Sequence, residues 1–454
     1  MSYDIQCRDT ICALATPMGL GALAIVRASG PKSHEIFAQI FKKKRGVNKP
    51  ARALYGDIID DDSSIIDEVM ALYFVGGKSF SGEDSFEIHC HGNHIIVDRI
   101  LKRLCALGAR LAEPGEFSLR AVLNKKIDLA QAESILELIH AQSESAQKVA
   151  LLGVRGGLRE KIAPIHEALI NTLAHIEARM DFPDEDLGGY DKSHLLSTLL
   201  QCAAQLQELL RHAPHALKLS EGARIVICGK PNAGKSTLLN TLCGEERAIV
   251  HETAGTTRDV IEACLLIHDI PITMVDVAGI RDYAEAEHIE KIGMEKALYE
   301  LKRAHLVIWL ADATQRNPFD DAVIEEQVAA LEVPVLKVLN KSELLHGEHT
   351  HDGLSISAKL GLGIGDLQGL IYGHVVGQKS PTQDMFITKA RQRDEVAQAL
   401  SHLQEAHQAL SSGWADEVVT AELRACGFCF DRLFGTTLSE DVLDTIFSQF
   451  CIGK

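Results

Sequence analysis

Residues 229–236 read Gly-Lys-Pro-Asn-Ala-Gly-Lys-Ser, and this octapeptide decides the fold class of the sequence around it. It fits the pattern G-x-x-x-x-G-K-S, follows the apolar run Arg224–Cys228 and precedes a helical pattern at Thr237–Leu242. In such a loop the glycines let backbone N–H groups surround phosphate, the lysine meets the β/γ oxygens and the serine hydroxyl binds Mg²⁺. The stretch predicts a phosphate-binding loop between a strand and a helix; the alternative is a glycine-rich surface turn.

Three further pieces follow in the order that a GTPase requires. Gly255-Thr256-Thr257-Arg258 offers a hydroxyl to the Mg²⁺, and Asp276-Val277-Ala278-Gly279 closes a strand near the metal and the γ-phosphate. Asn340-Lys341-Ser342-Glu343 and Ser357-Ala358-Lys359 each close a later strand, where guanine is read. We therefore expect Ser236 and Thr257 to be Mg²⁺ ligands and Lys235 to bind phosphate and take part in catalysis. The residues expected to contact GTP are Asn232, Ala233, Gly234, Lys235, Ser236, Thr237, His251, Glu252, Thr253, Ala254, Gly255, Thr256, Thr257, Asp276, Val277, Ala278, Gly279, Asn340, Lys341, Ser342, Glu343, Ser357, Ala358 and Lys359.

Two positions depart from the usual GTPase pattern. The guanine-reading N-K-x-D motif ends here in Glu343, whose extra methylene moves the carboxylate by about one bond length. Ile280 stands where a Ras-like GTPase carries a water-orienting glutamine, and an aliphatic side chain cannot polarise water. Hydrolysis must therefore use a group from elsewhere, and the acidic segment 281–295 is the place to look. Any one carboxylate there can equally belong to a solvated helix face.

The hydrophobic pattern divides the chain into segments of different texture. Short apolar runs punctuated by Gly, Pro and Asp predict strands in residues 1–118. Apolar residues from Ile162 to Met180 recur every three or four positions, which predicts an amphipathic helix, and helical patterns return after about Ser380. Between them, residues 224–373 alternate buried strands with helices. We expect a multidomain α/β and α protein with an N-terminal α+β domain (1–118), a helical domain in two parts (119–215 and 379–454) and an inserted Ras-like α/β domain (216–378).

Charge and cysteine content restrict the class of protein. The 454 residues carry a formal net charge of −17, which argues against a broad electrostatic grip on nucleic acid or an anionic membrane. Residues 1–120 hold 15 basic and 15 acidic groups, whereas residues 216–378 hold 15 and 24, so the excess acid lies outside the N-terminal part. Eleven cysteines without framework spacing, no signal peptide and no bilayer-spanning apolar stretch lead us to expect a cytoplasmic protein with no membrane partner.

Motifs throughout the chain resemble those of the MnmE (TrmE) family of tRNA-modification GTPases. The resemblance covers essentially the whole sequence from near residue 9. It rests on Gly229–Ser236, Gly255–Val260, Asp276–Arg281, Asp9–Ala13, Gly82–Asp84, His89–Gly92, Pro114–Phe117 and the terminal pentapeptide Phe450-Cys451-Ile452-Gly453-Lys454.

The resemblance implies a GTPase activated by K⁺-dependent pairing of two G domains in a homodimer. Asn232, His251, Thr253 and Thr256 fall on the family's K⁺-contact positions, and His251 is a departure that a main-chain carbonyl contact would tolerate. Glu290 matches the family's catalytic glutamate across two extra residues. A bound cation would then replace an arginine finger, and Glu290 would orient the water in place of the missing glutamine.

The resemblance also implies that the N-terminal domain binds a one-carbon tetrahydrofolate, in the 5-formyl or 5,10-methylene state. Arg27, Glu87, Lys126 and Lys454 fall on the folate-contact positions. A carboxylate can accept hydrogen bonds from the pterin edge, and cations suit the glutamate tail. For the first three residues the alternative is an ordinary surface ion pair. Cys451 matches a near-terminal cysteine proposed to face the folate, although a small buried hydrophobe is an equal interpretation.

The leading hypothesis is thus a tRNA-modifying enzyme. With an FAD-containing MnmG-like partner it would install an aminomethyl-type (carboxymethylaminomethyl) group on C5 of the wobble uridine of certain tRNAs. A regulatory or ribosome-assembly GTPase shares every G-domain motif but needs neither the folate residues nor the terminal pentapeptide. A folate-binding scaffold with a vestigial GTPase is a third reading.

Three other clusters carry weaker hypotheses. Cys426 and Cys429 have C-x-x-C spacing, but a structural zinc site needs four ligands and this pair supplies two, so it is expected to pack in a helix. His89, Cys90, His91 and His94 crowd one segment, which is expected to be a strand-end loop of the N-terminal domain motif and not a metal site. The basic run Lys42–Arg45 is expected to be a solvated loop, with a contact to tRNA as the alternative.

Overall fold

The computed structural model describes residues 9–47, 49–181, 191–245, 261–276, 299–315, 318–319, 333–345, 353–376, 384–437 and 440–453. The chain forms two compact units. Unit 1 holds residues 1–136, 154–199 and 401–454, and unit 2 holds residues 137–153 and 200–400. Unit 1 is therefore assembled from three separate parts of the sequence, and unit 2 from two.

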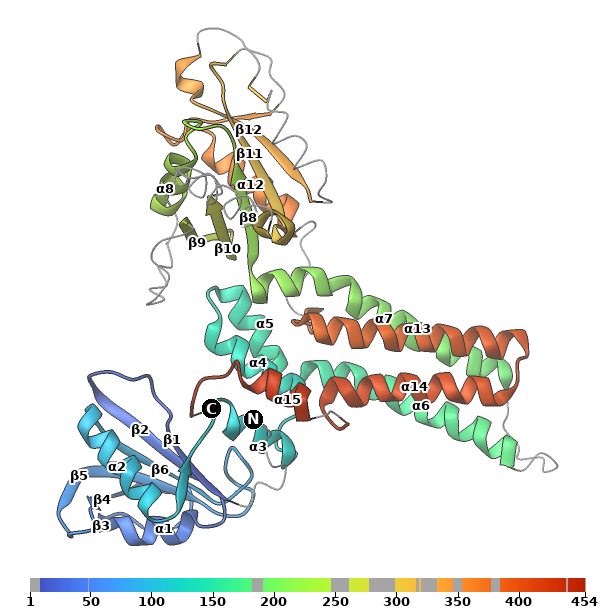
Figure 1. The fold of residues 1–454 in the computed structure, drawn as a ribbon. Helices are drawn as coiled ribbons and strands as arrows, with labels where there is room; N and C mark the ends of the chain where they lie inside the picture. Colours follow the sequence, from blue (N-terminus) through green and yellow to red (C-terminus); the bar gives the residue numbers. More distant parts are fainter. Residues whose placement is uncertain are drawn as a thin grey trace, which may run out of the picture. The chain divides into compact units, whose positions relative to one another are not determined.

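A seven-stranded sheet forms the N-terminal part of unit 1 (Figure 1). Its strand order is β3-β4-β5-β6-β2-β1-β7. Among the described strand pairs of this sheet, β1–β7 is parallel and the others are antiparallel. The strands are β1 (Thr10–Leu14), β2 (Gly21–Ser29), β3 (Phe41–Arg45), β4 (Leu54–Ile59), β5 (Ile65–Phe74), β6 (Ser85–Gly92) and β7 (Ala109–Leu111).

The two faces of this sheet have different roles. Helices α1 (Ser33–Ile40) and α2 (His94–Ala106) share one hydrophobic core with alternate residues of the strands, such as Val26 and Ile88. Because side chains alternate along a strand, Arg27 and Glu87 lie on the opposite face, and the register places them directly across from each other.

An ion-pair network ties the next helix to the edge of this sheet. In α3 (Glu116–Leu123), Arg120 is fully buried and donates to Asp9 Oδ1 (2.7 Å), Glu116 Oε1 (2.9 Å) and the carbonyl of Asp9 (2.8 Å). Burial acts to raise the pKa of the Glu116 carboxyl, but hydrogen bonds from Arg110, the Glu113 N–H and Arg120 outweigh it and hold that pKa below its usual value.

The end of the chain returns to the same place. Phe447 and Phe450 pack with Leu119 and Leu129 in one core cluster, and the Gly115 N–H donates to the carbonyl of Cys451 (3.4 Å). Gly115 has φ +71°, and a Cβ there would lie 2.6 Å from the Phe447 oxygen, so only glycine allows this close approach. Two segments more than 300 residues apart in sequence thus pack side by side.

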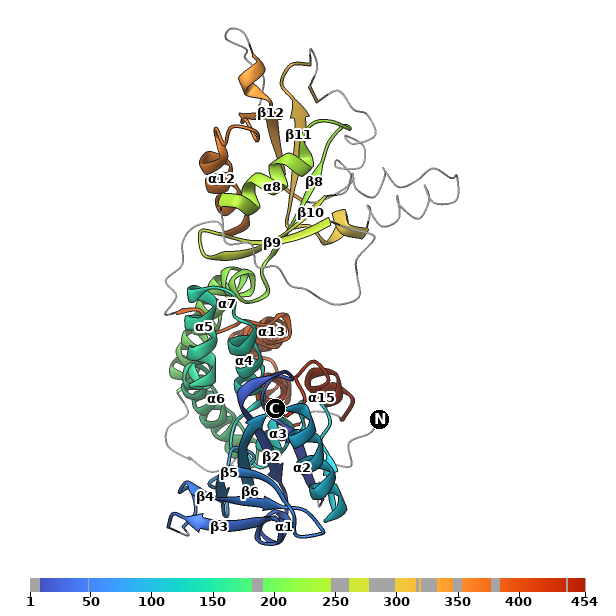
Figure 2. The ribbon, with the colours of Figure 1, turned by 90° about the vertical axis from the view of Figure 1, so that its left-hand side faces the viewer.

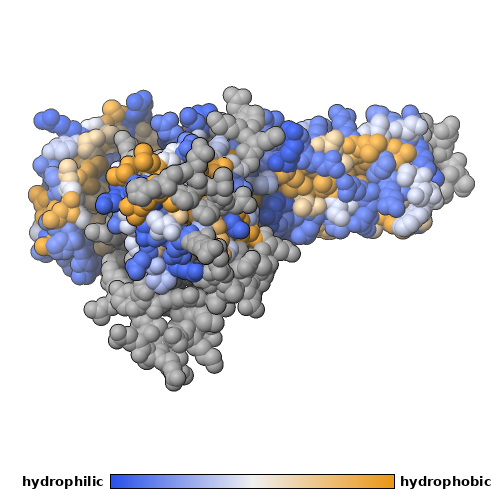
Figure 3. All heavy atoms as spheres, turned by 90° about the horizontal axis from the view of Figure 1, so that it is seen from above, coloured by the Kyte–Doolittle hydropathy of each residue, from blue (hydrophilic) through white to orange (hydrophobic). Residues whose placement is uncertain are grey.

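The helical part confirms the amphipathic pattern from Ile162 to Met180. In unit 1, α6 (Gly157–Asp181) packs along α14 (Asp416–Phe434), with Arg424 paired to Glu177 at 2.5 Å (Figure 1). Figure 2 views α6 nearly along its axis. The long helices at the right of Figure 3 show hydrophobic residues grouped between hydrophilic ones, as amphipathic helices do. The sequence predicts that the helical pattern after residues 183–189 ends at about Pro214, but α7 (Lys192–Glu221) continues through that proline. The remaining helices are α4 (Leu129–His140), α5 (Glu144–Val154), α7 (Lys192–Glu221), α13 (Ala390–Ser412) and α15 (Glu440–Phe447).

Unit 2 contains a six-stranded sheet of order β13-β12-β11-β8-β10-β9. Every pair is parallel except β9–β10, an antiparallel edge pair that the sequence pattern did not predict. The apolar β-branched runs predict five strands, and the structure has a strand at each of them: Arg224–Cys228, Ile272–Val275, Leu306–Leu310, Val335–Leu339 and Gly353–Ile356. The elements are β8 (Ala223–Cys228), α8 (Lys235–Glu245), β9 (Ile261–Ile267), β10 (Ile270–Asp276), β11 (Leu306–Asp312), β12 (Val335–Asn340), the 3₁₀ turn η1 (Ser342–Leu344), β13 (Leu354–Ser355) and α12 (Ile364–Val376).

The predicted α/β and α multidomain fold class is confirmed. Among the described residues, every helix is too short or too polar to traverse a lipid bilayer.

The buried Arg120 network makes a testable prediction about local stability. Arg120→Met keeps an unbranched apolar stem but removes the guanidinium and leaves the buried Glu116 short of one cation, which should cost about 3–5 kcal/mol. Amide exchange in α3 and β1 should then accelerate by more than about 100-fold at pH 7. The control Lys102→Met removes an exposed pair with Asp98 and should cost less than about 1 kcal/mol.

The same network sets a pH dependence. Because the folded pKa of Glu116 is depressed, its contribution to stability is present above the unfolded value near 4.5 and is lost as pH falls through the folded value. Arg120→Met should weaken this dependence. Equal exchange rates in the variant and the wild type would contradict the assignment.

Candidate nucleotide site and N-terminal pocket

The octapeptide 229–236 forms a tight loop from the end of β8 to the start of α8. At Gly229 a Cβ would lie 2.1 Å from the Leu310 carbonyl oxygen, and at Gly234 (φ +94°) it would lie 2.3 Å from Asn340 Nδ2. Only glycine permits these approaches, which hold the loop against the neighbouring strands. Asn232 is exposed and left-handed at φ +63°. The N–H groups at the start of α8 face the loop, as in helix N-termini that hold phosphate.

Lys235 lies inside this loop. Its ammonium donates to the carbonyls of Gly229 (3.1 Å) and Lys230 (2.9 Å), and the residue is only 6% exposed. A cation held inside a turn rich in backbone N–H groups has the position that a phosphate-binding lysine needs.

Ser236 and Asp276 bring two oxygen ligands together. Strand β10 runs parallel to β8, so its carboxyl end places Asp276 beside the first turn of α8. The Ser236 hydroxyl donates to Asp276 Oδ2 at 3.3 Å, and Asp276 is 1% exposed. A hydroxyl and a buried carboxylate are ligands that suit Mg²⁺, directly or through its waters. These residues fit the cation, and Thr257, the other expected ligand, lies outside the described residues.

Asn340 links the phosphate-binding loop to the guanine-reading segment. Its Nδ2 donates to the Ala233 carbonyl (2.9 Å), and its Oδ1 accepts from the Ala358 N–H (2.9 Å). Thr241 of α8 donates to the Ala358 carbonyl at 2.6 Å, which fixes the same segment from the other side. One buried amide thus links the phosphate loop to two segments that follow it by more than 100 residues in the sequence.

Glu343, the departure from the N-K-x-D pattern, points into this assembly. It sits on η1 after Lys341, whose αL backbone (φ +67°) turns the chain. A hydrogen bond with Ser357 lowers the pKa of the Glu343 carboxyl, so the group is ionised at neutral pH. Its Oε2 is buried and accepts no hydrogen bond from any described residue. An orphaned carboxylate oxygen is what a site requires in order to accept from the N–H edge of guanine.

Lys341 is held by an ion pair that the sequence pattern did not reveal. Its ammonium lies 2.7 Å from Asp312 Oδ2, at the end of β11. Burial acts to raise the pKa of Asp312, but the Lys341 and Thr314 hydrogen bonds outweigh it and hold the pKa below its usual value. Asp312 ends β11 and Lys341 follows the parallel strand β12, so both lie at one edge of the sheet, but no local pattern marks this aspartate as the partner of the lysine.

The other expected guanine-side residues lie on the same edge. Ser342 donates its N–H to the Ile356 carbonyl (3.1 Å), Ser357 is fully buried, and Lys359 and Thr237 are exposed. A second group of expected residues lies outside the described part of the chain. It comprises His251, Glu252, Thr253, Ala254, Gly255, Thr256, Thr257, Val277, Ala278, Gly279, Glu290 and Lys454.

In unit 1, Arg27 and Glu87 line a small pocket on the sheet face opposite α1 and α2. The Arg27 Nε donates to Glu87 Oε1 at 2.9 Å, and the guanidinium lies 5.8 and 5.7 Å from the ring centres of Phe80 and Phe117. The pocket has a volume of about 110 Å³, less than a pocket for a whole drug-sized ligand. It can take one edge of a ring. Its other lining residues are Ser29, Phe74, Ser81 and Ser85.

Two further expected folate residues lie nearby but do not line that pocket. Lys126 donates to the Gly77 carbonyl (2.7 Å), and its stem packs where a Cβ on Gly82 would fall. Cys451 is exposed, so a small buried hydrophobe is the wrong interpretation for it. The aromatic residues Phe80 and Phe117 were missed by the sequence reasoning because nothing in the local pattern separates them from core residues.

The two clusters that were not expected to bind a metal pack against, or pair with, other residues of the protein. Cys426 and Cys429 are buried along α14, and His91 pairs with Asp67 at 2.8 Å. One other group among the described residues brings possible ligands within 4.8 Å of one another, namely His402, Glu405 and Glu422. The His402 to Glu422 hydrogen bond of 2.7 Å accounts for its geometry.

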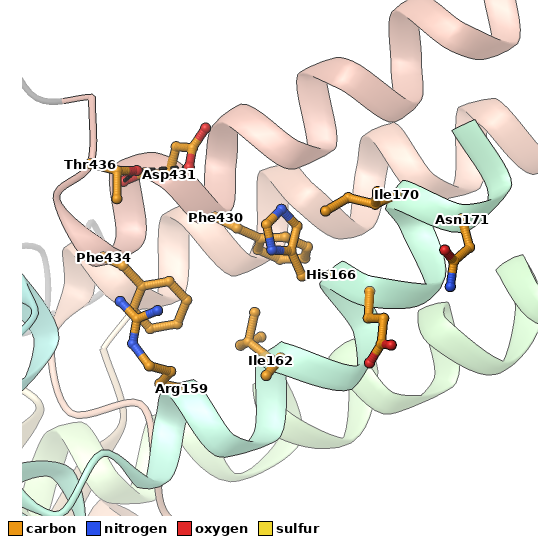
Figure 4. A pocket seen from close by; sticks show the side chains of 11 residues that line it. Arg159, Ile162, His166, Ile170, Asn171, Phe430, Asp431, Phe434 and Thr436 are labelled. Atoms are coloured by element: carbon orange, nitrogen blue, oxygen red, sulfur yellow. Dashed lines mark hydrogen bonds between the residues drawn. The ribbon is translucent and has the colours of Figure 1, made fainter. Parts of the chain in front are cut away.

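A groove of about 310 Å³ between α6 and α14 lies apart from these residues (Figure 4). Arg159 stacks on Phe434, with the guanidinium 4.2 Å from the ring centre, and His166 meets Phe430 edge-on. The side chains that line the groove are thus paired with one another. Among the described residues that line it, none has a buried polar atom that lacks a hydrogen-bond partner.

Comparisons with known proteins agree with this architecture. Residues 10–126 match the family model described as the GTP-binding protein TrmE N-terminus, and residues 129–451 match the MnmE helical domain. The tRNA modification GTPase MnmE of Legionella pneumophila (strain Paris) is 38% identical over 452 residues, covering 98% of this chain and 99% of the relative. That of Pseudothermotoga lettingae is also 38% identical, over 457 residues, covering 98% of this chain and 100% of the relative.

Among solved structures, Era of Aquifex aeolicus bound to GDP and AlF₄⁻ is 25% identical. The match covers 40% of this chain and 66% of that one with a TM-score of 0.29, so the assignment rests on the family models and the full-length relatives. A family model that spans residues 129–451 and relatives that align with nearly the whole chain establish that this protein belongs to the MnmE family of tRNA modification GTPases.

Proposed function

We propose that this protein is a GTP-hydrolysing enzyme that takes part in the modification of tRNA. The observation that carries the proposal is the edge of the unit 2 sheet, where the phosphate loop, Asp276 and the Asn340 and Ala358 segments are joined by hydrogen bonds. Such an edge binds a nucleotide in α/β proteins. Family membership supplies the tRNA part of the proposal.

The chain's own residues divide the work on the nucleotide. Gly234, Lys235 and the first N–H groups of α8 hold the phosphates, and Ser236, with Thr257, provides oxygen ligands for Mg²⁺. Asn340, Glu343 and the Ala358 segment read the guanine edge. Glu343 reaches the base despite its extra methylene because η1 and the Ser357 hydrogen bond set the position of its carboxylate. Mg²⁺ supplies the positive charge that the phosphates need.

Catalysis requires a group in place of the glutamine that Ile280 replaces. In our proposal Glu290 orients the attacking water, and Asn232, His251, Thr253 and Thr256 hold K⁺ where two G domains of a homodimer meet. The exposed, left-handed Asn232 at the tip of the loop supports this, because its side chain is available to a group arriving from outside. K⁺ supplies charge where an arginine finger would otherwise act.

The N-terminal pocket is the proposed site for a one-carbon tetrahydrofolate, 5-formyl or 5,10-methylene. Glu87 can accept from the amino-pyrimidinone edge of the pterin, while Arg27 holds the carboxylate in place and its guanidinium lies 5.8 and 5.7 Å from two aromatic ring centres. A pocket of about 110 Å³ fits that edge, and the remainder of the molecule would extend past Lys126 and toward Cys451. Lys454, which lies outside the described residues, is a further proposed contact.

The tRNA product completes the proposal. With an FAD-containing MnmG-like partner, the protein would add a carboxymethylaminomethyl-type group to C5 of the wobble uridine in the cytoplasm. The test is mass spectrometry of tRNA incubated with the full chain, the flavoprotein, GTP and tetrahydrofolate labelled in its one-carbon unit. We expect a labelled wobble uridine. An unlabelled and unmodified uridine, or normal wobble modification in a strain that lacks this protein, would refute it.

The cation mechanism predicts that GTP turnover depends on the salt. Turnover in KCl should exceed that in NaCl by about 100-fold or more, because an arginine finger at a comparable place contributes about 10³–10⁵. Asn232→Ala and Glu290→Ala should lose this stimulation, while Asn171→Ala on α6 and Glu287→Ala should keep it. Equal rates of wild-type turnover in the two salts would rule the mechanism out.

The Asn340 bridge predicts a loss of nucleotide affinity. Asn340→Ala leaves the Ala358 N–H and the Ala233 carbonyl without their partner, and each unsatisfied buried group costs about 1–3 kcal/mol. Binding of a fluorescent GDP analogue should weaken by about 10- to 100-fold. Asn171→Ala is the matched control, and unchanged affinity in Asn340→Ala would show that the bridge does not support the site.

A further inference from the structure

A short hairpin in the N-terminal sheet carries a charge opposite to that of the chain as a whole. Between Glu35 and Asp57 there are six basic residues and no acidic one, in a protein whose net charge is −17. We call residues 41–56, which hold all six of these basic residues, the basic hairpin. Its cations are Lys42, Lys43, Lys44, Arg45, Lys49 and Arg52.

The hairpin lies at the outer edge of the sheet (Figure 1). Lys42–Arg45 were expected in a loop, but the structure places them in β3, which pairs only with β4 among the described strands. All four are exposed, as are Lys49 and Arg52 in the connection to β4. A bulge between Lys43 and Arg45 re-aims the side chains at that point, so the cations spread over the edge and both sides of it.

Only one of the six cations is neutralised by a described residue. Lys44 lies 2.5 Å from both Asp57 and Glu68, and these contacts raise its pKa. Lys42, Lys43, Arg45, Lys49 and Arg52 form no ion pair within the described part of the chain. Like charges this close repel one another, so a counter-charge from outside the chain would be favourable.

Protection of a sheet edge explains part of this pattern. Lysines on an edge strand prevent pairing with other chains. That role accounts for β3 but not for Lys49 and Arg52, which lie beyond the strand. A shallow hollow lined by Lys44, Arg45, Tyr55, Glu68 and Met70 also adjoins the strand, and it offers an aromatic ring next to the cations.

We propose that the basic hairpin binds the phosphate backbone of tRNA. This rests on the proposed function, which supplies RNA as the polyanion. Lysine offers a point charge and arginine a planar fork of donors, and both suit phosphate oxygens. Same-side residues of a strand are about 6.6 Å apart, a spacing that can follow successive phosphates. Contacts of this kind orient the tRNA without reading its sequence, and the Tyr55 ring gives an unpaired base a surface on which to stack.

The test is binding of the full chain with GTP to fluorescent tRNA between 50 and 200 mM KCl. In the triple variant Lys42→Gln, Lys43→Gln and Arg45→Gln, affinity at the lower salt should fall by at least about tenfold. The slope of log Kobs against log[salt] should become less negative by about 2–3, since each lost phosphate contact removes about 0.7–0.9. A Lys42→Arg, Lys43→Arg double variant should bind as the wild type does.

The matched control removes the same charge from exposed positions outside the hairpin, two on helices and one in a turn, through Lys102→Gln, Lys148→Gln and Arg155→Gln. It should bind tRNA normally. The proposal is overturned if the two triple variants behave alike, if the hairpin variant binds normally but self-associates, or if it loses binding to phosphatidylglycerol vesicles and keeps binding to tRNA. Loss of tRNA binding with no wobble modification by the wild type would support the hairpin and refute the proposed reaction.

Discussion

The buried amide of Asn340 is the constraint on which the nucleotide site depends. Through one acceptor and one donor it joins the phosphate loop to the segment that ends in Ala358, and so fixes the distance between the phosphates and the base. A side chain can make both bonds only if Gly234 leaves room beside it, and a Cβ there would lie 2.3 Å from Asn340 Nδ2. The glycine and the amide therefore depend on each other.

The N-terminal pocket depends on a comparable arrangement in a different sheet. Strand alternation sends Val26 and Ile88 into the core under α1 and α2 and leaves Arg27 and Glu87 on the other face. The Arg120 network and the phenylalanines of the terminal segment then hold α3, which carries Phe117 to the rim of the pocket. Two motifs on which the family resemblance rests, one that begins at Pro114 and one that begins at Phe450, contact each other beside this pocket.

Local patterns predicted most of the nucleotide site because its parts are turns with strict requirements. The glycines of the loop, Asp276 at a strand end and Asn340 at the next can be read from spacing, since parallel strands end at one edge. Asp312, the partner of Lys341, and the antiparallel β9 could not be read in this way. An isolated aspartate has many possible partners, and an edge strand obeys no stricter pattern than a core strand does.

The sequence by itself determined the phosphate-binding loop, the alternation of strands and helices around it and the membership of the family, because each depends on residue types at fixed local spacing. Only the tertiary structure decided that Glu343 presents an orphaned buried oxygen, that Arg27 lies next to two aromatic rings, and that a run of basic residues expected in a loop lines the edge of a sheet. These are contacts between residues distant in sequence. Their partners are selected by packing and register, which no local pattern encodes.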